Sequence, residues 1–158
     1  MIQSQIQYTI YTLCLIQDGN QVLLLDRQHD DFKGFIPPGG KLEFPESPVQ
    51  CAIREVYEET GLKVDQLIYK GLYECVNPDS HERYIIFNYL SKSFKGKLNG
   101  DDAEGGRPVW VDIEEVASLP MQKSIRRRMP FFFEDGTFEI HVVWDDHKNE
   151  KEVVITKT

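Results

Sequence analysis

Apolar and polar positions alternate in short runs along most of the chain, which indicates a protein built largely of strands. Residues 8–16 are rich in Tyr, Thr, Ile and Leu, and the turn sequence Gln-Asp-Gly-Asn leads from them into a second apolar run. Asn-Pro-Asp-Ser marks a second tight turn further along the chain. The pattern predicts strands at 8–16, 21–27, 65–76, 83–94, 107–113, 137–144 and 151–157.

One helix is marked at both ends and is predicted over residues 47–60. Ser47 suits the N-cap, Pro48 the first helical position, and Gln50 completes a capping box with Ser47. Gly61 suits the left-handed residue that ends a helix. Shorter helical segments are expected at 113–119 and within 122–129. Two prolines exclude a helix from 28–40, which is expected to be a loop with a short extended piece.

These elements predict an α/β (α+β) fold in which a mixed β-sheet is packed between helices, with a C-terminal β-hairpin. The 158 residues suit a single domain, 1–158, and contain no internal repeat, low-complexity segment or linker.

The predicted helix has two distinct stripes. At helical spacing, one stripe is apolar and the next is acidic; they comprise Val49, Ala52, Ile53 and Val56, and Glu55, Glu58 and Glu59. Like charges three and four residues apart destabilise a helix, and the cation next to them in the chain is Arg54, which is placed to pair with Glu58.

The plain interpretation of this acidic stripe is a solvated helix face, but a solvated face usually mixes signs. The stripe also follows the glycine pair Gly39–Gly40, whose backbone can approach a ligand closely. Clustered carboxylates beside a free carbonyl suit hard cations such as Mg²⁺ or Mn²⁺. We therefore expect a divalent metal to relieve the repulsion.

The net charge of -8 argues against nucleic-acid and membrane-surface partners, which are bound through clustered positive charge. It leaves room for a small phosphate-bearing substrate, because metal ions can supply positive charge locally. Three widely spaced cysteines favour buried reduced thiols over disulfides or zinc ligands. We expect a cytoplasmic protein, since neither a signal peptide nor a membrane-spanning apolar run is evident.

The stretch from Gly40 to Leu62 resembles the Nudix box, Gly-x5-Glu-x7-Arg-Glu-U-x-Glu-Glu-x-Gly-U, where U is a bulky aliphatic residue. Every defined position fits, which makes the match far more specific than a short glycine motif. The matching residues are Gly40, Glu46, Arg54, Glu55, Val56, Glu58, Glu59, Gly61 and Leu62.

The resemblance implies the Nudix fold, an α/β/α sandwich, and metal-dependent hydrolysis of a nucleoside diphosphate linked to another group. The metal ligands that it implies are the carbonyl of Gly39 with Glu55, Glu58, Glu59 and the distal Glu104. Glu55 or its neighbour Glu58 would be the general base, and Arg54 would hold the glutamates. Glu46 would be structural.

Two of these implied roles have plain alternatives. The segment around Glu104 would otherwise be a flexible acidic loop, in which Asp101 and Asp102 compete for the role of ligand. Arg27, at the end of a predicted strand, is expected to contact substrate phosphate in MutT-like enzymes, but it is equally suited to a plain surface position.

Residues outside the box must select the nucleoside. The segments 35–43, 110–120 and 131–142 resemble the MutT-like subgroup that hydrolyses oxidised purine nucleotides such as 8-oxo-dGTP to a nucleoside monophosphate and pyrophosphate. By that resemblance, Gln122 would contact the purine edge. Phe35 would stack on the base, although an aromatic residue there also suits the core.

Two other functions remain open. An ADP-ribose pyrophosphatase would carry a proline near the position of Pro78, which turn chemistry also explains. A Nudix-like nucleotide sensor is disfavoured, because degenerate boxes lose the glutamates that are intact here. The sequence leaves open both a monomer and a homodimer.

Overall fold

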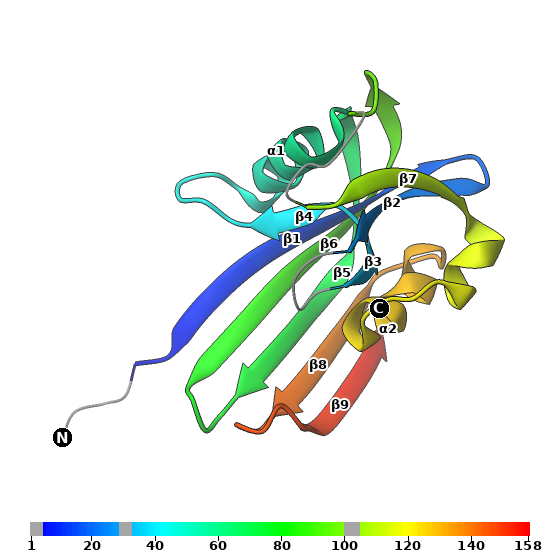
Figure 1. Ribbon diagram of the computed structural model, residues 1–158. Coiled ribbons are helices and arrows are strands. Elements are labelled where there is room, and N and C mark those ends of the chain that lie inside the picture. The colour runs from blue at the N-terminus through cyan, green and yellow to red at the C-terminus, as the bar shows by residue number, and fades with distance from the viewer. Residues whose placement is uncertain (1–4, 29–32, 100–104) are drawn as a thin grey trace.

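The computed structural model describes residues 5–28, 33–99 and 105–158. Within these residues, nine strands form a single sheet that is accompanied by two α-helices and one 3-10 helix (Figure 1). The strands are β1 (Gln7–Asp18), β2 (Gln21–Arg27), β3 (Gly34–Ile36), β4 (Gly39–Lys41), β5 (Lys63–Asn77), β6 (Glu82–Lys95), β7 (Arg107–Asp112), β8 (Phe138–Trp144) and β9 (Glu150–Lys157). The helices are α1 (Pro48–Thr60), the 3-10 helix η1 (Ile113–Ser118) and α2 (Lys123–Phe132).

The sheet is mixed, as predicted. Its main path runs β3-β2-β1-β6-β5-β8-β9, with β4 paired to β1 and β7 to β2. The pairs β1–β6 and β5–β8 are parallel, and the other pairs are antiparallel. Strand β1 forks on one side, because residues 11–13 pair with β4 while residues 16–18 pair with β2. This fork brings the Gly39–Gly40 backbone to the middle of the sheet.

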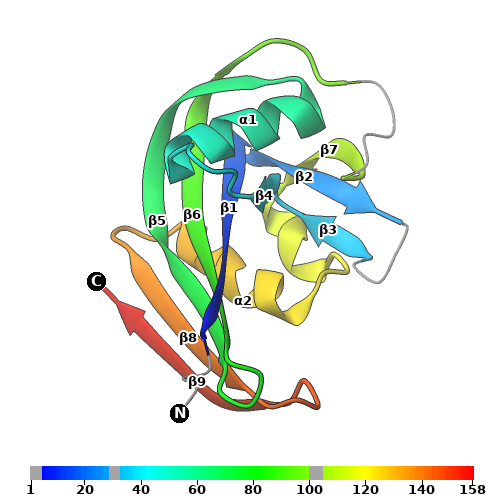
Figure 2. The same ribbon diagram turned by 90° about the vertical axis from the view of Figure 1, so that its left-hand side faces the viewer.

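Helices α1 and α2 lie on opposite faces of the sheet, which confirms the sandwich (Figures 1 and 2). The alternation along β1 explains the two buried layers, since neighbouring side chains on a strand point to opposite faces. Cys14 and Ile16 pack with Ala52 and Val56 of α1, whereas Leu13 and Leu15 pack in the cluster that includes Ile125, Met129 and Phe132 of α2.

Helix α1 begins and ends as its sequence predicts. The Ser47 side chain accepts from the Gln50 N–H, the Gln50 side chain accepts from the Ser47 N–H, and Gly61 is left-handed with φ 84°. The predicted apolar stripe was wrong at Val49, which is 42% exposed and belongs to none of the buried clusters. Val49 lies in the first turn, before the part of the helix that packs on the sheet, and Cys51 is buried there instead.

The second half of the chain follows the predicted order with two differences. Segment 113–118 is a 3-10 helix, and α2 continues through Pro130 to Phe132. Proline removes one backbone hydrogen bond from a helix, but burial of Met129 and Phe132 stabilises the helix on both sides of it.

The C-terminal hairpin of β8 and β9 adds two strands beside β5. Arg127 of α2 donates to both carboxylate oxygens of Glu150 in β9, at 3.1 and 2.9 Å, and so joins the hairpin to the helix that covers it. Cys14, Cys51 and Cys75 are buried and free, as predicted. In the described ranges, no helix is long and apolar enough to cross a membrane.

Replacing Gly61 with alanine should lower the free energy of unfolding by about 2–5 kcal/mol. A left-handed backbone costs a non-glycine residue about 1–2 kcal/mol, and the new Cβ would lie 2.6 Å from the Lys97 carbonyl oxygen, adding an overpacking cost of about 1–3 kcal/mol. Urea denaturation measures the change. Gly19→Ala is the matched control, because Gly19 also has positive φ but no atom lies within 4 Å of its added Cβ. Equal losses in both variants would contradict the packing argument.

Candidate active site

Arg54 contacts three of the box glutamates at once. Its Nη2 and Nε donate to the two oxygens of Glu46 at 2.6 and 3.0 Å, and its Nη1 donates to Glu55 at 2.8 Å and to Glu58 at 3.2 Å. Nη2 also donates to the Lys41 carbonyl, at 3.2 Å. The predicted pairing with Glu58 is confirmed, but the two-pronged contact with Glu46 has the shortest distance.

This network keeps both Glu46 and Arg54 charged. The Arg54 guanidinium lowers the pKa of Glu46 to about 2, helped by the backbone N–H of Glu43. The hydrogen bond to Glu46 raises the pKa of Arg54, and that to Glu55 adds to the effect. Arg54 therefore stays charged and ties the loop before α1 to the acidic stripe on the helix.

Glu55 and Glu59 lie against the glycine pair. A Cβ on Gly40 would come within 2.3 Å of the carboxylate carbon of Glu55, so a side chain there would displace that carboxylate. The Gly39 N–H donates to Glu59 Oε1 at 3.2 Å. Gly39 is more tightly constrained, since its Cβ would lie 2.2 Å from the Thr12 backbone carbonyl oxygen across the β1–β4 pair. The strand β4 backbone is therefore in direct contact with the two carboxylates.

The pKa of Glu59 is raised to about 9, first by burial and then by the neighbouring Glu55 carboxylate, although the Gly39 N–H and the charge of Arg27 act in the opposite direction. Two carboxylates this close can share one proton or a cation. Their hard oxygen atoms fit a divalent ion such as Mg²⁺. Over the residues with defined positions, no three His, Cys, Asp or Glu side chains form a ready-made metal cage, so a metal would draw on a backbone carbonyl or on a rearranged Glu58.

The predicted ligands differ in their surroundings. Glu55 is 15% exposed and Glu58 is 55% exposed, so Glu55 is held while Glu58 extends into solvent. Glu104 lies outside the described residues. Gly105, which follows it, is described, and its backbone approaches Glu59, since an added Cβ would lie 2.5 Å from Oε2. Gly105 was not predicted from the sequence. The feature that could have indicated it is the adjacent pair Gly105–Gly106.

The residues predicted to contact substrate lie in two neighbouring parts of the fold. Arg27 ends β2, opposite Gly34, and its charge acts on Glu59. The Phe35 N–H donates to the Pro120 carbonyl at 2.8 Å, which brings β3 close to the segment that leads to Gln122, the N-cap of α2. Phe35 is half-buried and packs against the core cluster on the α2 side. Base contact by Phe35 or Gln122 stays a prediction.

Arg54→Lys is expected to lower the free energy of unfolding by about 1–3 kcal/mol, because an ammonium cannot reproduce the two-pronged contact with Glu46 while also reaching Glu55. Arg83→Lys serves as the control: Arg83 contacts Glu74 at 2.7 Å and is 38% exposed. Its loss should stay below about 1 kcal/mol. Chemical denaturation compares the two variants, and indistinguishable midpoints would exclude a special role for Arg54.

Comparison with known proteins agrees with this geometry. Residues 7–132 match the NUDIX domain. Relatives include the "Uncharacterized Nudix hydrolase YvcI" of Bacillus subtilis, 31% identical over 70% of this chain and 70% of its own length. The "Putative 8-oxo-dGTP diphosphatase YtkD" of the same organism is 32% identical, over 83% of this chain and 75% of its own.

Two further comparisons concern function and fold. An ADP-ribose pyrophosphatase of Methanocaldococcus jannaschii is 36% identical over 66% of this chain and 62% of its own length. The crystal structure of a MutT protein from Bacillus halodurans superposes with a TM-score of 0.80, at 24% identity, over 93% of this chain and 97% of that one, which supports the fold. These matches establish that the chain belongs to the Nudix hydrolase family and is a pyrophosphohydrolase.

Proposed function

We propose that this protein is a metal-dependent, MutT-like diphosphatase that converts 8-oxo-dGTP or a related dNTP and water into a nucleoside monophosphate and pyrophosphate. The observation that carries the proposal is the placement of Glu55 and Glu59 against the Gly39–Gly40 backbone, with Arg54 holding Glu55. Three buried free thiols favour a reducing compartment, so we place the enzyme in the cytoplasm.

The residues that would hold Mg²⁺ or Mn²⁺ are Glu55, Glu58 and Glu59, with the carbonyl of Gly39 and, by resemblance, Glu104. When bound, such an ion neutralises diphosphate charge and lowers the pKa of a water molecule. The carboxylates supply oxygen ligands of the type that these ions prefer.

The chain itself contributes positioning and proton transfer. Glu55 accepts a hydrogen bond from Arg54 Nη1, which orients its carboxylate, and the absence of a side chain at Gly40 leaves space for it. Glu58 is more exposed and can reach a water molecule from the same stripe. Either carboxylate can accept the proton of the attacking water. Arg27 supplies positive charge next to Glu59, on the side where substrate phosphate would lie.

The preference for an oxidised purine nucleotide is supported by similarity to the B. subtilis protein named "Putative 8-oxo-dGTP diphosphatase YtkD". ADP-ribose is a second candidate, because the M. jannaschii relative named ADP-ribose pyrophosphatase has 36% identity. Both substrates carry the diphosphate that the carboxylates would engage, so they differ only in what the rest of the pocket accepts.

A substrate panel separates these candidates. Purified protein is incubated with 8-oxo-dGTP, the four dNTPs, ADP-ribose and Ap4A, each with Mg²⁺ and with Mn²⁺, and products are separated by chromatography. We expect the highest kcat/KM for 8-oxo-dGTP, with nucleoside monophosphate and pyrophosphate as products. Faster turnover of ADP-ribose than of every triphosphate would reverse the order of the candidates.

Glu55→Gln should reduce kcat by about 100-fold or more while the protein stays folded, since the change removes a charge and a proton acceptor but little volume. Glu74→Gln is the matched control. Glu74 is 14% exposed against 15% for Glu55, and it also pairs with an arginine, but it lies outside the box. The control should keep kcat within about twofold. Equal activity of both variants would remove Glu55 from the mechanism.

A further inference from the structure

An open pocket of about 460 Å³ lies between α1 and the β5–β6 pair. Helix α1 crosses these two strands near the start of β5 and the end of β6 (Figure 2). The residues that line the pocket are Ile53, Arg54 and Tyr57 of the helix, and Lys63, Val64, Asp65 and Lys95 of the strands. Three of them are basic and one is acidic, although the whole chain has a net charge of -8. The pocket therefore gathers positive charge on an acidic protein.

The two lysines of the pocket lie directly opposite each other. Lys63 is the first residue of β5 and Lys95 is the last residue of β6, and they are partners in the antiparallel pair. Partners of this kind have α-carbons about 4.5–5.5 Å apart, so their ammonium groups can reach one ligand together. Like charges that lie directly opposite destabilise a sheet. The arrangement is therefore unfavourable in the free protein, and a bound anion would relieve it.

The charges of these two lysines are not balanced by a neighbouring carboxylate. Within residues 5–28, 33–99 and 105–158, neither Lys63 nor Lys95 forms an ion pair. Asp65, the acidic residue of the pocket, accepts a hydrogen bond from Ser93 Oγ at 2.7 Å. The Lys63 ammonium instead lies over the Tyr57 ring, 5.6 Å from its centroid. A cation–π contact attracts the ammonium to the ring but leaves its charge in place.

The chemistry of the pocket suits a phosphate group. Lys63, Lys95 and Tyr57 are all exposed, so a ligand can reach them from solvent. An ammonium group is a compact charge with three donors, and lysine is a common partner of phosphate oxygens. Two ammonium groups attract a doubly charged anion more strongly than a carboxylate of single charge. The exposed Tyr57 ring also offers a surface on which a nucleobase could stack.

Arg54 connects this pocket with the candidate active site. It lines the pocket, and its Nη1 donates to Glu55 and Glu58. Its other donors contact Glu46 and the Lys41 carbonyl, so the two lysines are the groups left to hold a ligand. An anion bound to them would add negative charge near the guanidinium that orients Glu55. The pocket is thus distinct from the carboxylate site but adjoins it through Arg54.

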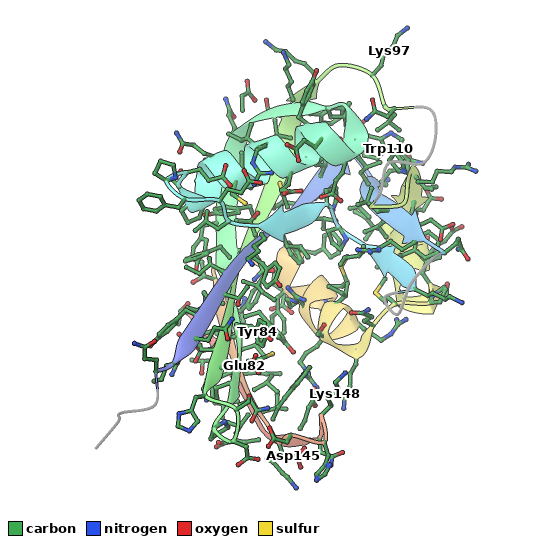
Figure 3. All side chains as sticks on the ribbon, turned by 60° about the vertical axis from the view of Figure 1, so that its left-hand side comes forward. Glu82, Tyr84, Lys97, Trp110, Asp145 and Lys148 are labelled. Carbon is green, nitrogen blue, oxygen red and sulfur yellow. The ribbon has the colours of Figure 1, made fainter. Side chains whose placement is uncertain are left out.

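A second pocket, of about 260 Å³, has the opposite charge. It lies beside Trp144, at the end of the sheet that is remote from α1. Its charged lining residues are Glu82, Asp145, Asp146 and Lys148. Figure 3 shows Glu82, Asp145 and Lys148 together at this end of the molecule. Three carboxylates around one lysine repel a phosphate group, which makes this pocket a natural comparison for the basic one.

We propose that the pocket between α1 and the β5–β6 pair is a binding site for the phosphate groups of a small anion, to which Lys63 and Lys95 donate. Its ligand is inorganic pyrophosphate or the diphosphate of a nucleotide, which share this chemistry. The inference goes beyond the proposed hydrolysis and does not depend on it, because both lysines lie outside the Nudix box, residues 40–62. It gives the chain an anion site that is separate from its metal-binding carboxylates.

Isothermal titration calorimetry with pyrophosphate tests binding without catalysis. The buffer is freed of metal on a chelating resin, so that the active-site carboxylates repel the probe. Wild-type protein should give a saturable isotherm for one site. Lys63→Gln/Lys95→Gln should raise Kd at least about 10-fold, because it removes two charge-assisted hydrogen bonds.

Lys97→Gln/Lys148→Gln is the matched control for this titration. It removes the same charge from two exposed lysines outside the basic pocket, one at the end of the molecule near α1 and one at the opposite end (Figure 3). Its Kd should stay within about twofold of the wild-type value, since charges in solvent are screened beyond about 10 Å. No saturable binding by the wild type, or equal Kd values in the two double variants, would overturn the proposal.

The same titration with dGDP distinguishes the two ligand sources. Binding that is tighter than that of pyrophosphate by about threefold or more, with the gain removed by Tyr57→Leu, would assign a nucleotide whose base stacks on the ring. Equal or weaker binding of dGDP would assign the inorganic ion. Both results support the site.

Steady-state kinetics show whether the site is separate from the substrate site. Lys63→Gln/Lys95→Gln should keep kcat and KM for the best nucleotide within about twofold of wild type, because neither lysine contacts the carboxylates. A clearly raised KM with unchanged kcat would place the lysines in the substrate site and overturn the proposal. If no nucleotide is hydrolysed but pyrophosphate binds as expected, the proposed function fails and the anion site stands.

Discussion

The constraint on which this structure depends is the close approach of Glu55 and Glu59, two acidic side chains that repel each other in a partly buried position. A helix alone would not keep them there, because like charges at i,i+4 favour separation or unfolding. The chain holds them by three separate means: Arg54 contacts one of them, the Gly39 N–H contacts the other, and the glycine backbone leaves space for both.

The remainder of the fold supplies the free energy that keeps α1 in place. The helix is capped at both ends, and Ala52 and Val56 are fully buried against β1 and β2. Burial of a side chain the size of Val56 contributes about 1.5–3 kcal/mol, and that of the smaller Ala52 contributes less. The apolar face of α1 thus stabilises a helix whose acidic stripe is only partly compensated by Arg54.

The parts of the fold that are encoded locally were predictable. The capping box, the terminal glycine and the order of the strands depend on neighbouring residues, and the structure confirms them. Pairing between distant strands was not predictable, because no local pattern specifies that β1 lies parallel to β6. Val49 was mistaken for the same reason: its angle on the helix suits burial, but burial depends on how far the sheet extends beneath the first turn.

The same distinction applies to the site. The box residues were identified by their resemblance to the Nudix box, and helical spacing placed Arg54 correctly beside Glu58. The extent of its contact with Glu46 depends on how the preceding loop folds back, which spacing does not reveal. The pocket beside Trp144 is lined by two segments that are far apart in the sequence, 75–84 and 144–148, so its acidic rim could not be inferred from either of them alone.

The parallel pairing of β1 with β6 also constrains the order of folding. Gln7 pairs with Glu82, and Ile16 pairs with Ser91, so the first strand has its central partner only after β6 has left the ribosome. Such long-range pairing slows folding, because a long loop must close before the contacts form. The whole of α1 precedes β6 in the chain, and its acidic stripe therefore emerges before the sheet that positions it. Until then, the edge of β1 that later pairs with β6 is open to incorrect partners. The negative charge of the acidic stripe on the nascent chain would help to repel other copies of the chain.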